Sequence, residues 1–131
     1  MDYGIAVGTA APFADAVARV REALQAQGFG VLTEIDVQAT LRDKLGVDME
    51  PYLILGTCNP SLAHQALNTD RRIGLLLPCN VVIRTEANRT VIEALDPQAM
   101  VAVAGESSLQ PVADEAATGL RAASDTLREA D

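Results

Sequence analysis

The two cysteines, Cys58 and Cys79, are the residues of this chain whose type and context best suit chemistry. Each precedes an asparagine and lies beside a proline-marked break, in the segments GTCNP and LPCN. Cys58 is expected at the end of a buried strand, one residue before a helix cap, where free backbone N–H groups and the helix dipole favour negative charge. We therefore expect a thiol with a lowered pKa, suited to act as a nucleophile, a redox group or a soft-metal ligand. The competing interpretation is a small buried hydrophobic residue.

A metal site is one use of these thiols. His64, the single histidine, lies on the helix predicted to follow Cys58. Cys58, Cys79 and His64 could supply a Cys2His metal site with an open fourth position, as in catalytic zinc sites or copper carriers. The spacing between Cys58 and His64 matches no zinc finger, and a single histidine on a helix surface is usually solvated. The sequence therefore does not distinguish a metal ligand from a solvated side chain.

The two asparagines that follow the cysteines could line the same pocket. Their alternative roles are helix cap and turn residue, and we favour the cap for Asn59. The predicted ligand-binding residues are Cys58, Asn59, Cys79 and Asn80. The two cysteines are also the candidates for catalysis if the protein is an enzyme.

Other catalytic patterns are missing from the sequence. It contains no G-x-G-x-x-G, no G-x-x-x-x-G-K-[ST], no G-x-S-x-G and no C-x-x-C. Glu34 and Asp36 lie on one side of a predicted strand end and could form a carboxylate pair. An acid directly before a helix is more often its cap, and we favour that role for Asp36.

The hydrophobic pattern predicts the elements that must position these residues. Short apolar or alternating segments predict strands at residues 3–7, 29–35, 52–56, 73–77, 81–85 and 89–95. Helical spacing and capping signals predict helices that open at Pro12, after Asp36 and after Asn59, and a long C-terminal helix over residues 109–127.

These elements predict an α+β fold with a single mixed β-sheet and helices packed on it. The hairpin over residues 81–95 adds antiparallel pairing to the parallel pairing that helical crossovers create. Segment 52–56 is nearly all apolar, so we expect it in the centre of the sheet and covered on both faces. In the short second helix, Val37, Leu41 and Leu45 are predicted to face one way.

Length and charge narrow the class of protein. The 131 residues fit one domain, 1–131, and a hydrophobic content of 49% is typical of a globular chain. A net charge of −8 disfavours binding to nucleic acids and anionic lipid surfaces. No apolar run reaches the ~20 residues needed to cross a bilayer. The N-terminal segment lacks the pattern of a secretory signal, so we expect a cytoplasmic protein with free thiols.

Several blocks of the sequence together resemble a known family. They are the segments FGVLTEIDV at 29–37, KLG at 44–46, YLILGTCNP at 52–60, LAH at 62–64 and GLLLPCNV at 74–81. In this order they are similar to the DUF302 domain, whose fold is called TT1751-like, and the likeness covers roughly residues 2–105. The resemblance implies a small α+β domain with a mixed sheet, paired into a homodimer, from a bacterial or archaeal source. It implies no activity, because the family is named for having no assigned function.

The leading hypothesis is a cytoplasmic homodimeric binding domain with a cysteine-containing site for a small ligand or a soft metal ion. The homodimer has one further argument, because the edges of an open sheet need to be covered or paired. A thiol-dependent enzyme or redox component in sulfur chemistry is the second hypothesis. The third is a purely structural or interaction domain in which both cysteines are packed away.

Overall fold

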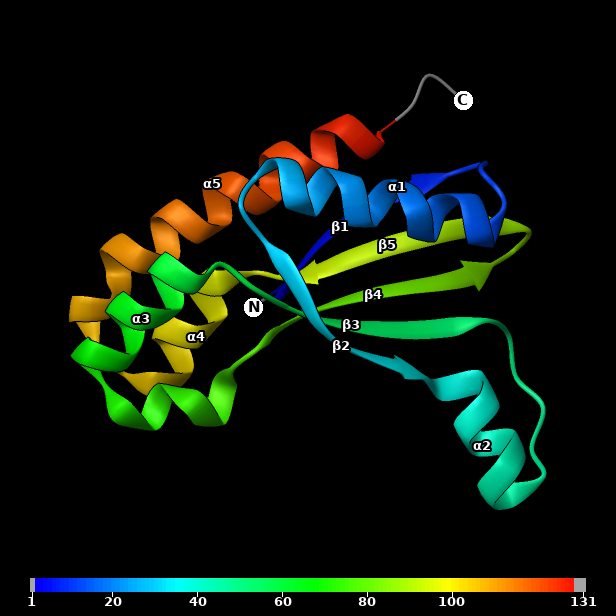
Figure 1. Ribbon diagram of the computed structural model, residues 1–131, viewed down its shortest axis with the longest axis horizontal. Helices are drawn as coiled ribbons and strands as arrows, with labels where there is room; N and C mark the ends of the chain where they lie inside the picture. Colours follow the sequence, from blue (N-terminus) through cyan, green and yellow to red (C-terminus); the bar gives the residue numbers. More distant parts are fainter. Residues whose placement is uncertain (1, 129–131) are drawn as a thin grey trace.

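One five-stranded sheet with helices packed on it forms the body of the protein (Figure 1). The computed structural model describes residues 2–128. The strand order is β1-β5-β4-β3-β2, and the strands are β1 Gly4–Thr9, β2 Gly30–Asp36, β3 Tyr52–Cys58, β4 Cys79–Glu86 and β5 Arg89–Leu95. The helices are α1 Phe13–Ala26, α2 Val37–Leu45, α3 Pro60–Thr69, α4 Pro97–Ala104 and α5 Gln110–Leu127, with 3-10 segments η1 Arg71–Leu76 and η2 Ser107–Leu109.

The α+β class, the single sheet and the long C-terminal helix are confirmed, but every strand pairing is antiparallel rather than mixed. Parallel pairing would require a crossover that carries the chain back to the other end of the sheet. Instead, α3 and η1 form an excursion beyond one end. The chain leaves the sheet at Cys58 and re-enters it at Cys79, which pairs with Thr57. The neighbouring strands β3 and β4 therefore run in opposite directions.

The predicted strand at residues 73–77 is wrong, because this segment lies in and directly after η1. Asp70 caps the 3-10 segment, and its carboxylate accepts a hydrogen bond from the Arg72 N–H at 3.0 Å. Ile73 is buried, whereas Gly74 and Leu75 are exposed. A short apolar run does not by itself distinguish a strand from a helical segment, and here the burial follows a helical spacing.

Local sequence signals account for the helix ends and turns, and the predicted cap at Asp36 and the predicted hairpin are confirmed. Gly28 follows α1 with φ 84°, a conformation that favours glycine. Asp36 accepts a hydrogen bond from the Ala39 N–H at 2.9 Å and caps α2. Between β4 and β5, Ala87 and Asn88 have φ values of 50° and 65°, as a two-residue hairpin turn requires.

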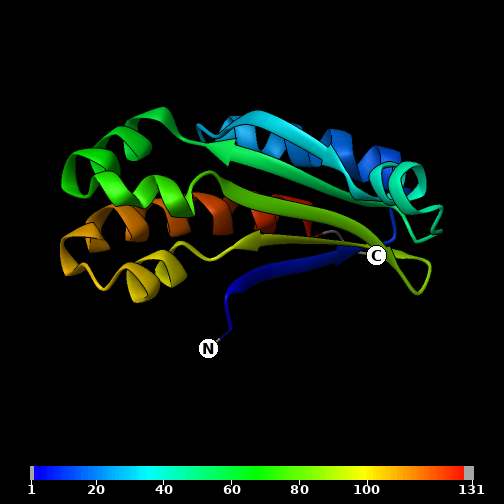
Figure 2. The same cartoon turned by 90° about the horizontal axis from the view of Figure 1, so that it is seen from below.

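Helices α1 and α5 cover one face of the sheet and bury the main core. The strands contribute Leu53, Leu55, Val81, Ile83 and Ile92, and the helices contribute Ala16, Val20, Leu24, Ala116 and Leu120. Because side chains alternate along a strand, the residues between these point to the opposite face. In Figure 2 the strands lie in front of α1 and α5, so no helix layer from the described residues covers this second face.

Two elements, segment 52–56 and α2, are less buried than their apolar sequences suggest. Segment 52–56 is in the interior of the sheet, as predicted, but Tyr52 and Ile54 stay partly exposed rather than covered. Helix α2 buries no residue, so the side chains predicted to face one way, Val37, Leu41 and Leu45, add nothing to the core. It projects from the corner of the sheet where β2 ends (Figure 1).

Candidate functional site

A hollow opens at the end of the sheet where β3 ends and β4 begins, between α3, α4 and α5. Its volume is about 50 Å³. The wall is almost entirely apolar: it includes Phe29, Leu62, Ala63, Ala66, Ile73, Leu77, Val101, Leu109, Val112, Ala113 and Ala116. Both cysteines, Thr57, Asn59 and Met100 also line it. The sulfur atoms are therefore set in a hydrophobic surrounding.

The sheet brings the two cysteines together. Cys58 is the last residue of β3, and Cys79 is the first residue of β4, directly opposite Thr57. The Thr57 hydroxyl donates a hydrogen bond to the Cys79 carbonyl oxygen at 2.9 Å and ties the two strand ends together. Both cysteines are free thiols of intermediate exposure. Their shared position was predicted from their similar contexts in the sequence.

Burial, rather than the helix dipole, dominates the acidity of these thiols. It raises the pKa of Cys58 above its ordinary value of 9.0. Burial also raises the pKa of Cys79 to about 11, with a further contribution from electrostatic repulsion by Cys58. An apolar surrounding disfavours the charged thiolate. The lowered pKa expected for Cys58 is therefore not found, and both thiols are protonated at neutral pH.

Met100 is the site residue that sequence reasoning missed. Its Sδ atom lies 3.8 Å from Cys79 Sγ, which donates to it. Met100 lies on α4, which begins at Pro97 after the Asp96 cap. No spacing rule relates Met100 to Cys79, because the contact joins a helix and a strand end that only the tertiary fold places side by side. A methionine in a short apolar stretch is otherwise typical of core packing.

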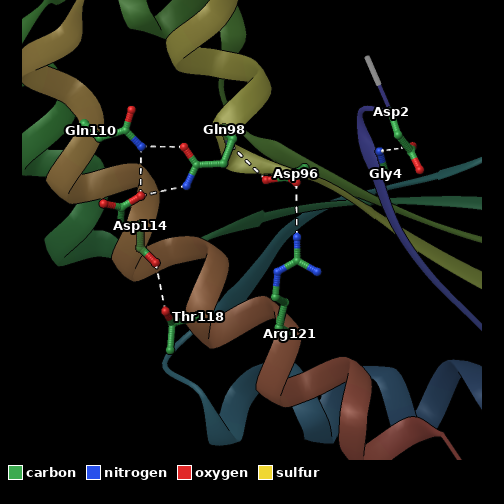
Figure 3. A network of polar contacts seen from close by, with 8 residues as sticks. All are labelled: Asp2, Gly4, Asp96, Gln98, Gln110, Asp114, Thr118 and Arg121. Carbon is green, nitrogen blue, oxygen red and sulfur yellow. Dashed lines mark hydrogen bonds and ion pairs between the residues drawn. The ribbon is translucent and has the colours of Figure 1, made fainter.

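A polar network on the outside of the pocket wall holds α4 against α5 (Figure 3). The Gln98 side chain donates to the Asp114 carboxylate at 2.8 Å, and Gln110 donates to both Gln98 and Asp114. These hydrogen bonds lower the pKa of Asp114. Arg121 forms an ion pair with Asp96, the cap of α4, at 3.3 Å. The network fixes the helix that carries Met100.

The asparagines have separate roles. Asn59 lines the hollow and caps α3, because its side chain accepts a hydrogen bond from the Leu62 N–H at 3.2 Å. Pro60 follows at the first position of the helix, as predicted. Asn80 pairs with Gly56, is exposed and does not line the hollow.

His64 is not brought to the cysteines. It is exposed on α3, and its Nε2 lies 3.2 Å from the Asn68 side-chain nitrogen. Within residues 2–128, no three His, Cys, Asp or Glu side chains form a group that could hold a metal ion. The structure therefore does not assemble the Cys2His set of Cys58, Cys79 and His64.

The carboxylates at the end of β2 do not form a pair. Asp36 serves as the cap of α2, as favoured above. Glu34 forms an ion pair with Arg21 of α1 at 2.7 Å. Each acid thus has a structural partner at the surface.

An antiparallel sheet with a helical layer on one face and a sulfur-lined hollow at its end defines a small α+β domain with a candidate ligand site. The chain belongs to the family described as "Domain of unknown function DUF302", whose model matches residues 5–127. A solved structure, the uncharacterized conserved protein DUF302 from Bacillus stearothermophilus, is similar to this chain with a TM-score of 0.91 and 30% sequence identity. The match covers 98% of this chain and 100% of that one. No curated protein matches the chain.

Proposed function

We propose that this protein is a small binding domain whose ligand enters the sulfur-lined hollow at the end of the sheet. The proposal rests on one observation: two free thiols line the same apolar hollow, and space remains beside them. Sites for drug-sized molecules have volumes of about 300–1,000 Å³. A hollow of about 50 Å³ selects a much smaller ligand.

Protonated thiols favour binding over thiol catalysis. With a pKa of about 11, Cys79 is a thiolate in only about one molecule in 10,000 at pH 7. Nucleophilic cysteines are normally activated by a nearby base or positive charge. His64, the only histidine, is exposed elsewhere on α3. The enzyme hypothesis therefore has less support than the binding hypothesis.

Native-state alkylation tests whether the hollow admits small molecules. The protein is treated with iodoacetamide at pH 9, and each thiol is quantified by mass spectrometry. We expect both thiols to react without unfolding. Ala63→Phe, which fills the hollow, slows both reactions, whereas Gln65→Phe on the exposed side of the same helix leaves them unchanged. Thiols that react only after unfolding would support a structural domain and contradict the proposal.

We further propose a homodimer built on the uncovered face of the sheet. Tyr52, Ile54, Val82 and Val91 lie on this face and are partly exposed. Arg84 and Glu93 lie on the same face, so the patch carries both signs of charge. A two-fold axis through it would place the basic side chain of one copy near the acidic side chain of the other.

The reducing cytoplasm expected for this chain suits its two free thiols.

Light scattering after gel filtration tests the dimer. We expect the wild type to have twice the chain mass and Ile54→Asp to have the mass of one chain, because a buried charge disfavours the interface. The matched control is Leu75→Asp, which places the same charge at an exposed position outside the sheet. A wild-type protein that stays monomeric at high micromolar concentration would contradict the dimer.

No helix within residues 2–128 is long and apolar enough to cross a membrane. The absence of nucleic-acid binding stays a prediction from the net charge of −8.

A further inference from the structure

A thioether beside the two thiols provides the hollow with a third sulfur atom. Cys79 Sγ lies 3.8 Å from Met100 Sδ, and Cys58 directly follows Thr57, the residue that pairs with Cys79 across the two strands. The three residues come from the end of β3, the start of β4 and the middle of α4. All three line the same hollow.

This set of donors discriminates among metal ions. Zinc sites use Cys, His or carboxylate ligands, and a structural zinc site is closed by four of them. Within residues 2–128 no three such side chains gather. Thiolates together with a thioether are instead the donors that Cu(I) prefers. The Met100 thioether is the sulfur donor that the hollow offers beside the two cysteines.

The separation between the Cys79 and Met100 sulfur atoms fits two ligands of a three-coordinate ion. With metal–sulfur bonds of about 2.3 Å, two sulfur atoms on a trigonal ion lie about 4 Å apart. The Cys79 and Met100 sulfur atoms are already separated by 3.8 Å. Their side chains therefore need little rearrangement to share one ion. The volume of about 50 Å³ suits an ion of this kind better than an organic molecule.

We infer that Cys58, Cys79 and Met100 form a three-sulfur site for a soft monovalent cation of the Cu(I) class. This inference rests on the proposed binding function and names its ligand. On binding, each thiol releases one proton and coordinates as a thiolate, and the thioether coordinates as a neutral donor. The occupied site then carries one net negative charge. Asn59 caps α3 directly after Cys58, so the positive end of this helix lies beside the site and offsets that charge.

A competition titration tests the site. Cu(I), kept reduced under anaerobic conditions, is titrated into the metal-free full chain in the presence of a chromophoric Cu(I) chelator. We expect one Cu(I) per chain. X-ray absorption at the copper edge should show three sulfur neighbours at about 2.3 Å. Cys58→Ser and Cys79→Ser should each weaken binding by more than about 100-fold, since losing even an outer-shell partner of a metal site costs about 10–100-fold.

Methionine variants separate coordination from packing. Met100→Leu keeps the volume of the side chain but removes the sulfur, and we expect a loss of about tenfold in Cu(I) affinity together with two sulfur neighbours at the copper edge. The matched control, Met49→Leu, changes a methionine that does not line the hollow and should leave affinity unchanged. Unchanged affinity in Met100→Leu would overturn the three-sulfur site.

Native-state alkylation distinguishes failure of this inference from failure of the proposed function. Absence of Cu(I) uptake with thiols that react in the native state would overturn the metal site and leave the binding domain standing. If the protein neither takes up Cu(I) nor reacts with iodoacetamide in the native state, both the metal site and the binding domain are overturned. Zn²⁺ binding as tight as that of Cu(I) would also contradict the inference, because three sulfur donors including a thioether should favour the softer ion.

Discussion

The protein has two apolar clusters that are packed in different ways. The main cluster lies between the sheet and α1 and α5, and large side chains such as Leu55, Ile83 and Leu120 fill it. The smaller cluster joins α3, η1 and η2 through Ala66, Ile73 and Leu109. It lies at the end of the sheet, where short helical segments meet without a strand beneath them (Figure 1).

The difference explains why the hollow lies where it does. A sheet covered by two long helices brings extended surfaces into contact, and its branched side chains interdigitate to a density that leaves little space. At the end of the sheet, several of the facing positions are alanines, including Ala63, Ala66, Ala113 and Ala116. Alanine side chains at these positions, on α3 and on α5, are too small to close the space between the helices. The first cluster stabilises the fold, and the second leaves room for a ligand.

Truncating one leucine in each cluster is the strongest test of whether the two clusters differ in packing. Leu55→Ala removes a fully buried side chain from the filled cluster and should lower the free energy of unfolding by about 3–4 kcal/mol, because a new cavity is left. Leu109→Ala enlarges an existing hollow and should cost about 2 kcal/mol. Urea unfolding followed by circular dichroism measures both. Equal losses would show that the two clusters are equally well packed.

Local features of the fold could be predicted because neighbouring residues determine them. The caps at Asp36 and Asn59 and the turn at Ala87 and Asn88 depend on hydrogen bonds and backbone angles within a few residues. The pairing of strands depends on where the chain goes between them. No short-range signal shows that the excursion between Cys58 and Cys79 returns to the same end of the sheet. The antiparallel pairing of β3 and β4 was therefore missed.

The candidate site could be predicted in part for the same reason. The similar contexts of Cys58 and Cys79 indicated one shared site, and the structure brings them together, although Cys79 begins β4 instead of following a strand at residues 73–77. The raised pKa values depend on burial in the tertiary fold, which local sequence does not reveal. Met100 reaches the site from α4, so only the tertiary fold identifies it.

Gly119 lies against Phe29 at the edge of the hollow and allows a sharper test of the comparison. It lies in α5, where glycine is expected to cost about 1 kcal/mol relative to alanine. A methyl group at this position would lie 2.9 Å from Cε2 of Phe29, which belongs to the main cluster and also lines the hollow. Gly119→Ala should therefore lower the free energy of unfolding by up to about 2 kcal/mol, since overpacking costs about 1–3 kcal/mol and the gain in helix propensity offsets about 1 kcal/mol of it.

A double variant checks the origin of that loss. Adding Phe29→Leu removes the ring that the new methyl group would meet. The Gly119→Ala change should then be neutral or stabilising when measured in the Phe29→Leu background. If Gly119→Ala stabilises the otherwise unchanged protein, the contact with Phe29 does not limit packing at the edge of the hollow.

The smallest expected effect is an alkaline loss of stability from the thiol in the hollow. Cys79 has a pKa of about 11 in the folded protein against an ordinary value of 9.0, so the unfolded chain loses this proton first as the pH rises. The stabilisation is complete below pH 9 and disappears as the pH approaches 11. Between pH 8 and pH 10 the free energy of unfolding should fall by about 1 kcal/mol more in the wild type than in Cys79→Ala.

Urea unfolding of both proteins at the two pH values isolates this contribution, because the other titrating groups are shared. Parallel pH dependences would mean that Cys79 titrates as a solvated thiol. The hollow would then be wetter than its apolar wall indicates, and the contrast with the filled cluster would be one of water content as well as of packing.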